Sequence, residues 1–189
     1  MVKKMELIRM LNSPDNKRAL QAVEELRVRG WLRDGSLVGV PLCHVHIQGG
    51  DLLGANLSNV DFHQARLQNA DLSQANLSGA KLTRANLQGA NLSQADLSGA
   101  DLFKADLTEA CNLQDEQLKR ALRLWGALMP DGETYDGRFN LPGDLDFARW
   151  GRVDIYDPLA MAEFFGVSLE TYLYGQELGK QISVIEASL

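Results

Sequence analysis

The sequence predicts an all-β solenoid with α-helical appendages, and two observations about spacing support this fold class. Leucine or a close substitute recurs at every fifth residue from Leu37 to Leu107, and a small residue lies two positions before each centre. A helix would spread a period of five around its whole surface, and a flat strand requires a period of two. One large and one small apolar residue per five therefore indicate a coil whose successive sides each point two residues inward.

The number of sides in each coil follows from the second observation. Residues 66–83 match residues 86–103 at twelve of eighteen positions when the offset is twenty. The same offset gives the best agreement for the two variable residues after each centre, whereas offsets of five, ten and fifteen agree poorly. We therefore expect coils of four five-residue sides, stacked about 4.8 Å apart like paired strands.

These residues give the chain a resemblance to the pentapeptide-repeat family, whose signature is A-(D/N)-L-x-x. Ala70-Asp71-Leu72-Ser73-Gln74 and Ala90-Asn91-Leu92-Ser93-Gln94 are clear copies of it. The resemblance covers roughly residues 35–110 and implies a right-handed quadrilateral parallel β-helix, here of just under four coils. It implies a shape and no single activity. Val40-Pro41-Leu42-Cys43-His44 departs from the signature, so the first coil is expected to be less regular.

The N-terminal segment, residues 1–34, is predicted to form a helical cap. Two short helices are expected, and Ser13 would cap the second with Pro14 at its first helical position. An open solenoid end exposes apolar centres and unpaired backbone groups, which a cap covers. The β-helix is then expected to occupy residues 35–111.

The C-terminal segment, residues 112–189, is predicted to be mostly helical. A capping helix is expected over 114–124, followed by a short hairpin around the turn at 129–133. Two further helices are expected to begin at Pro158 and after Ser168, the second ending near residue 178. Residues 141–155 are expected to be irregular.

Composition narrows the classes of function. The formal net charge is −6, and the acidic excess lies in the C-terminal segment, so binding to nucleic acid phosphates is not expected. No signal sequence and no apolar run long enough to span a bilayer is evident, which favours a cytoplasmic protein without a membrane partner. Two cysteines do not indicate a disulfide framework.

No catalytic or cofactor-binding residue is predicted. No serine lies in a nucleophile elbow and no glycine-rich loop joins a strand to a helix, so the chain is not expected to be an enzyme. A weak candidate metal set exists among outward positions of the first two coils: Cys43, His44, His46 and His63. Outward positions of a solenoid vary freely and this spacing is not a recognised zinc pattern, so no metal site is predicted.

Aromatic residues point to a surface for a partner in the C-terminal segment, which holds ten of the thirteen in the chain. A cap over residues 112–129 leaves further aromatics available, and aromatics are enriched in the cores of interfaces. Four of them are the predicted partner-binding residues: Phe164, Phe165, Tyr172 and Tyr174. The competing interpretation is that these rings complete a small domain of the tail.

The leading hypothesis is a non-catalytic protein–protein interaction or scaffolding module with an unidentified protein partner, its oligomeric state left open. The first alternative, which the family resemblance suggests, is a DNA-mimicking binder of type II topoisomerase. Lys81 between Asp61 and Asp101 argues against it, because a cation interrupts the row of phosphate-like carboxylates. The second alternative is a DNA-binding regulator, since residues 159–170 are similar to part of a phage-repressor-type helix-turn-helix domain. That tail is too acidic to favour phosphate contact.

Overall fold

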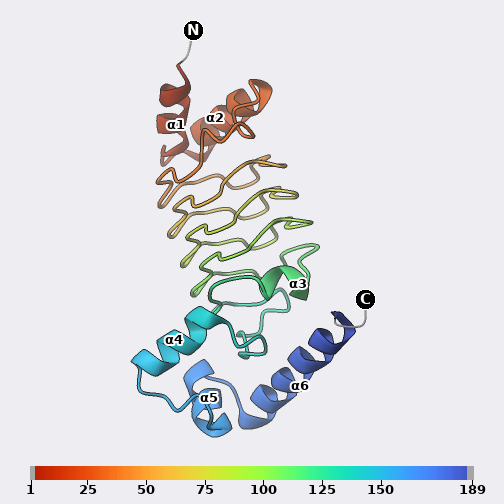
Figure 1. Cartoon of the computed structure of the whole chain (residues 1–189). Helices are drawn as coiled ribbons and strands as arrows, with labels where there is room; N and C mark the ends of the chain where they lie inside the picture. Colours follow the sequence, from red (N-terminus) through yellow and green to blue (C-terminus); the bar gives the residue numbers. More distant parts are fainter. Residues whose placement is uncertain (1–2, 187–189) are drawn as a thin grey trace.

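The computed structural model describes the backbone of residues 3–186 and the side chains of residues 3–180. A pair of helices lies at one end of an elongated molecule, stacked coils follow, and a helical unit lies at the other end (Figure 1). The described helices include no segment that is both long enough and apolar enough to cross a membrane.

The N-terminal end consists of α1 (Lys4–Leu11) and α2 (Asn16–Val28), which pack on each other through buried aliphatic residues. The helix α2 begins two residues later than expected, and the prediction that Ser13 caps it is wrong. The cap is Asp15, whose side chain accepts a hydrogen bond from the Lys17 amide, while the Ser13 hydroxyl accepts one from the Asp15 amide in the connecting turn. Both side chains satisfy local backbone donors, and only Asp15 lies directly before helical backbone.

The coils are held by parallel backbone bridges between residues twenty apart, from Pro41↔Asp61 to Asn91↔Cys111. This confirms the predicted offset. Thirteen of the fifteen centres donate to a carbonyl one coil further on, as Leu72 N does to Asn91 O at 2.9 Å. Each side contributes a single bridge between two turns, so the sides form isolated bridges and no long strands.

The interior of the coils is formed by the repeated leucine centres and small residues. All fifteen centres are buried, and so is every alanine that precedes one of them by two positions. Fully burying a leucine side chain contributes about 1.5–3 kcal/mol, and the pattern repeats this contribution on every side.

The expectation of a less regular first coil is wrong from residue 41 onward, since residues 41–60 repeat the bridge-and-turn pattern of the later coils, and Pro41 fits that pattern for a physical reason. This residue occupies the first bridged position, where no coil lies beyond it to receive a backbone N–H. Proline has no N–H to leave unpaired, and prolines at sheet edges also discourage pairing with another chain.

The ladder does not stop at residue 111, where the sequence placed the end of the β-helix. After a short helix α3 (Asp115–Leu118) it resumes with an offset of twenty-two, through Asp101↔Arg123 and Asp106↔Leu128. Residues 122–126 and 127–131 are therefore two further units. The helix expected over 114–124 ends at Leu118, because the Leu122 amide returns to pair with the Ala100 carbonyl.

The remaining chain forms a hairpin and three helices, α4 (Pro142–Trp150), α5 (Pro158–Phe165) and α6 (Leu169–Glu186). An antiparallel bridge joins Leu128 to Thr134. The stretch expected to be irregular contains α4, which begins with proline at its first position. The helix α6 continues to Glu186, beyond its expected end near residue 178, and completes the helical unit at the far end of the molecule (Figure 1).

Candidate interaction surface

The helix α4 is attached to the last coil by a buried carboxylate, Asp144. Its Oδ1 accepts the backbone amides of Leu124 at 3.1 Å and Trp125 at 2.8 Å, and its side chain is fully buried. Burial raises the pKa of Asp144 to about 7, although both amide hydrogen bonds favour the ionised form. The adjacent Gly143 fits closely, since a Cβ there would lie 2.8 Å from the Leu122 carbonyl oxygen. This contact joins residues about twenty apart and was not predicted from the sequence.

An aromatic cluster fills the junction between the coils and the helical unit. Trp125 stacks on Phe103 with ring centroids 5.3 Å apart, and Phe147 of α4 meets both rings edge-on. The Trp125 indole also donates a hydrogen bond of 2.8 Å to the Phe164 carbonyl. We use the name aromatic cluster for Phe103, Trp125, Phe147, Trp150 and Phe164.

Three of the four predicted partner-binding residues pack inside the helical unit. Phe165 and Tyr172 are buried and stack with ring centroids 6.2 Å apart, and Phe164 is half-buried in the aromatic cluster. Only Tyr174 is exposed, at 66%. The four side chains therefore do not form one open surface, and the competing interpretation of a small tail core accounts for the first three.

Two other aromatic residues are far more exposed, and sequence reasoning did not select them. Trp150 ends α4 with 81% of its surface exposed, and Tyr156, in the link to α5, is 88% exposed. Leu159, in the first turn of α5, is 52% exposed. We call these three residues the α4–α5 corner. The signal in the sequence was a pair of aromatics outside any apolar periodicity: Trp150 lies within the stretch expected to be irregular, and Tyr156 directly follows that stretch.

Two unpaired cations lie on the turn of the coils beside the aromatic cluster. Arg84 and Lys104 follow their centres by two residues and occupy equivalent positions in adjacent coils. Both are exposed, and the described structure places no carboxylate within 4.0 Å of either charged group. The Lys104 ammonium lies 5.0 Å from the Trp125 ring centroid and 5.5 Å from that of Phe103.

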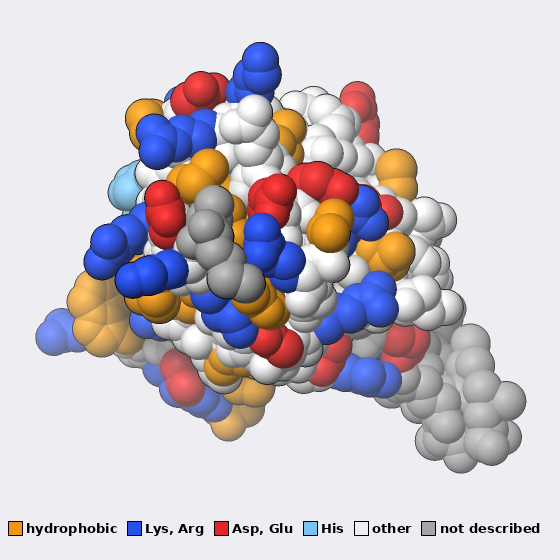
Figure 2. All heavy atoms as spheres, turned by 90° about the horizontal axis from the view of Figure 1, so that it is seen from above, with side chains coloured by type: hydrophobic (Ala, Val, Ile, Leu, Met, Phe, Trp, Pro, Cys, Tyr) orange, Lys and Arg blue, Asp and Glu red, His pale blue; other side chains and the backbone are white. Residues whose placement is uncertain are grey.

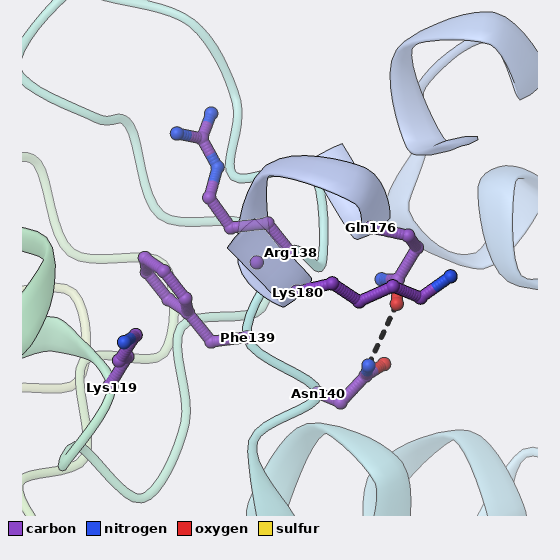
Figure 3. Close-up of a pocket in the computed structure, with 7 residues that line it drawn as sticks. Lys119, Arg138, Phe139, Asn140, Gln176 and Lys180 are labelled. Atoms are coloured by element: carbon purple, nitrogen blue, oxygen red, sulfur yellow. Dashed lines mark hydrogen bonds between the residues drawn. The ribbon is translucent and has the colours of Figure 1, made fainter. Parts of the chain in front are cut away.

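A pocket of about 660 Å³ lies between α6 and the loop that precedes α4 (Figure 3). Lys119, Arg138 and Lys180 line it, but their charged ends point in different directions in Figure 3. Each also has an acidic partner: Glu116, Asp136 and Glu177 respectively. The Asn140 side-chain amide donates a hydrogen bond of 2.7 Å to the Gln176 side-chain oxygen. This arrangement does not concentrate charge on one ligand.

The helical N-terminal end presents charges of both signs (Figure 2). Cations and carboxylates are interspersed there, and several are paired, including Lys4 with Asp34 and Arg29 with Glu25. A groove of about 750 Å³ separates α1 from α2, lined by Leu7, Met10 and Leu20 with a polar rim. Its rim carries charges of both signs, so charge does not select a partner for this groove.

The candidate metal residues do not converge. The structure brings the rings of His44 and His63 to 5.9 Å, but the His46 Nδ1 lies 2.8 Å from the Pro14 carbonyl oxygen. Burial, with a smaller contribution from Asp61, raises the pKa of the Cys43 thiol and so disfavours the thiolate that a metal requires. Across the described part of the chain, no three such ligands are placed to hold a metal ion.

The outward column of side chains that contains Asp61 alternates between negative and positive charge. Successive bridges stack Asp61, Lys81, Asp101 and Arg123, and the Arg123 guanidinium pairs with Asp101 at 2.5 Å. The interruption of the row by Lys81 is thus present in the structure.

The segment similar to a helix-turn-helix forms α5, a turn and the start of α6. One face of α6 lies against the 136–138 loop at Gly175 and Gly179, where added Cβ atoms would lie 2.4 Å from Asp136 and 2.2 Å from the Arg138 carbonyl oxygen. This face therefore serves packing within the unit.

Residues 36–74 and 75–115 match the family described as pentapeptide repeats, in eight copies. The chain therefore belongs to the pentapeptide-repeat family through this region, and the family fold is the right-handed quadrilateral β-helix. A comparison with curated proteins found no match.

Several solved structures are similar to the repeat region. Alr5209, a pentapeptide repeat protein from Nostoc PCC 7120, is 35% identical over 49% of this chain and 80% of its own, with a TM-score of 0.39. HetL from the same cyanobacterium, involved in heterocyst differentiation regulation, is 32% identical over 51% of this chain and 54% of its own, with a TM-score of 0.30. QnrB1, a plasmid-mediated fluoroquinolone resistance protein, is 17% identical over 57% of this chain and 64% of its own, with a TM-score of 0.24.

Proposed function

We propose that the chain is a non-catalytic protein–protein interaction module in which the coils hold the α4–α5 corner in place for a protein partner. The observation that carries this proposal is the exposure of Trp150 and Tyr156, both above 80%. Large aromatics are costly to leave in water and dominate the binding energy of interfaces.

The rigid attachment of α4 to the last coil strengthens the proposal. Trp150 stacks on Phe147 at 6.0 Å, and Phe147 contacts Trp125 of the last coil at 5.2 Å. Asp144 fixes the same helix through backbone amides of that coil. A side chain held in this way loses little conformational freedom on binding, which favours affinity.

The test is photo-cross-linking in the native cell with the double variant Trp150→Ala/Tyr156→Ala. We expect the protein to keep its thermal unfolding transition, because both side chains are exposed, and to lose its cross-linked protein partner. The control is Tyr174→Ala, which removes another exposed aromatic and should leave the partner bound. An unchanged set of partners in the double variant would contradict the proposal.

The alternating charges of Asp61, Lys81, Asp101 and Arg123 favour this function over DNA mimicry, which requires a uniform acidic row. The packed glycine face of α6 and the acidic tail likewise favour it over DNA regulation.

A further inference from the structure

Arg84 and Lys104 place two like charges at equivalent turn positions of neighbouring coils. Coils joined by backbone bridges lie about 4.8 Å apart, so the two side chains leave the backbone at neighbouring positions and their charges repel wherever the charged ends approach each other. Within the described residues, no carboxylate forms an ion pair with either group. An anion that contacts both side chains would relieve the repulsion, and a neutral partner would not.

The backbone at these two positions favours glycine over a long side chain. Arg84 has φ of 56° and Lys104 has φ of 53°, in the left-handed region, whereas Gly79 and Gly99 occupy equivalent turns elsewhere. A non-glycine residue there has a conformational cost of about 1 kcal/mol or more. Other long polar residues share this backbone conformation, among them Gln64, Gln74 and Gln94, so the conformation itself assigns no role to the cations but lets glycine replace either of them without strain.

The pair is continuous with the α4–α5 corner through ring contacts. Lys104 lies over Trp125, Trp125 contacts Phe147 and Phe147 stacks on Trp150, each step between 5.0 and 6.0 Å. A single extended ligand could therefore contact the charges at one end and the exposed indole at the other.

We propose that Arg84, Lys104 and the neighbouring aromatic cluster bind an acidic peptide segment of the protein partner. The inference rests on the proposed function and adds the chemistry of the partner. Carboxylates suit the two cations, and an apolar residue in the same segment would pack on Trp150. A nucleic acid fits less well, because tight binding of a phosphate backbone neutralises many phosphates and this site offers two cations.

The test measures binding of a fluorescein-labelled oligoglutamate peptide containing one phenylalanine, by fluorescence anisotropy at low salt. We expect wild-type binding that weakens as salt is added, since exposed charges are screened. The double variant Arg84→Gly/Lys104→Gly should bind at least about tenfold more weakly. Glycine suits the left-handed backbone, so this variant removes the charges without straining the turn.

Two matched variants separate a local site from general effects. Gln74→Gly/Gln94→Gly makes the same backbone change at stacked turns with φ of 57° and 56°, and Lys17→Ala/Arg18→Ala removes the same charge from the N-terminal cap. Both should bind the peptide within about twofold of wild type.

Three results would overturn the inference: no peptide binding by the wild type, an equal loss in the Lys17→Ala/Arg18→Ala variant, or tighter binding of a labelled oligothymidine than of the peptide. The proposed function has an independent test in the cross-linking of the Trp150→Ala/Tyr156→Ala variant. If that variant loses the partner while the peptide fails to bind, the module stands and only the acidic chemistry of its partner is wrong.

Discussion

The coils and the C-terminal helical unit are stabilised in different ways. In the coils, each side repeats the same buried leucine, small residue and backbone bridge, so stability is distributed over many equivalent contacts. The helical unit depends on single contacts, among them the amide hydrogen bonds of Asp144 and the close approach of α6 at Gly179. Outward residues of the coils are therefore free to serve binding, whereas most aromatics of the tail are committed to holding it together.

The largest effect should come from emptying the interior of the coils. Leu87→Ala removes a fully buried side chain in the middle of the ladder, and we expect a loss of about 2–5 kcal/mol in the free energy of unfolding. Chemical denaturation measures it. Lys81→Ala, on the outside of the adjacent side, is the control and should cost under about 0.5 kcal/mol. Equal small losses in both variants would refute the inward assignment.

The next effect concerns pH and the helical unit. The pKa of Asp144 is raised from 3.8 to about 7 by folding, so the folded state holds this proton more tightly than the unfolded state. Stability from this group is present below about pH 4 and falls as the pH rises to about 7, by up to about 4 kcal/mol.

Asp144→Asn keeps an oxygen acceptor for the two amides and cannot ionise. Unfolding followed by tryptophan fluorescence between about pH 4 and pH 7 should show a smaller dependence on pH in this variant than in the wild type. The same slope in both proteins would mean that Asp144 is not the titrating group.

A smaller effect is expected where α6 meets the preceding loop. Gly179→Ala would place a Cβ 2.2 Å from the Arg138 carbonyl oxygen, and a backbone atom cannot move aside cheaply. We expect a loss of about 1–3 kcal/mol and faster proteolysis of α6, although alanine favours helix formation. Gly151→Ala, whose nearest contact would be an ordinary 3.4 Å, should leave the proteolysis rate unchanged. Protection of α6 in the Gly179 variant would contradict this packing.

The smallest effect is expected at the turn cations. Arg84→Gly and Lys104→Gly each relax a left-handed backbone and reduce a like-charge repulsion, but glycine also increases the entropy of the unfolded chain. The net change in stability should lie within about 1 kcal/mol of zero, measured by thermal unfolding. A loss as large as that of Leu87→Ala would show that these side chains are structural.

The sequence predicted the coils well because their contacts are encoded locally. A period of five specifies which side chains point inward, and the offset of twenty specifies which residues stack, as the bridge between Asn56 and Asn76 illustrates. The two units at residues 122–131 escaped detection because α3 shifts the register by two residues, and Leu122 and Met129 replace the usual alanine and leucine. A strict period cannot follow such an insertion.

The candidate site was harder to predict, because burial of a tail aromatic depends on its tertiary partners. Phe165 and Trp150 are both large aromatics on short helices, yet Phe165 packs on Tyr135 and Tyr172 whereas Trp150 is open to solvent. Nothing in the local spacing distinguishes them. The stacking of Arg84 beside Lys104, in contrast, follows directly from the offset of twenty.

The most direct test of the account is hydrogen exchange of the protein alone and in complex with its cross-linked partner. Amides of the coils should exchange slowly in both states, because most of them are hydrogen-bonded to a neighbouring coil or within their own turn. Binding should add protection at residues 147–159 and at the turns around Arg84 and Lys104. Added protection confined to α1 and α2, with none at these positions, would contradict the assignment of the α4–α5 corner as the docking surface.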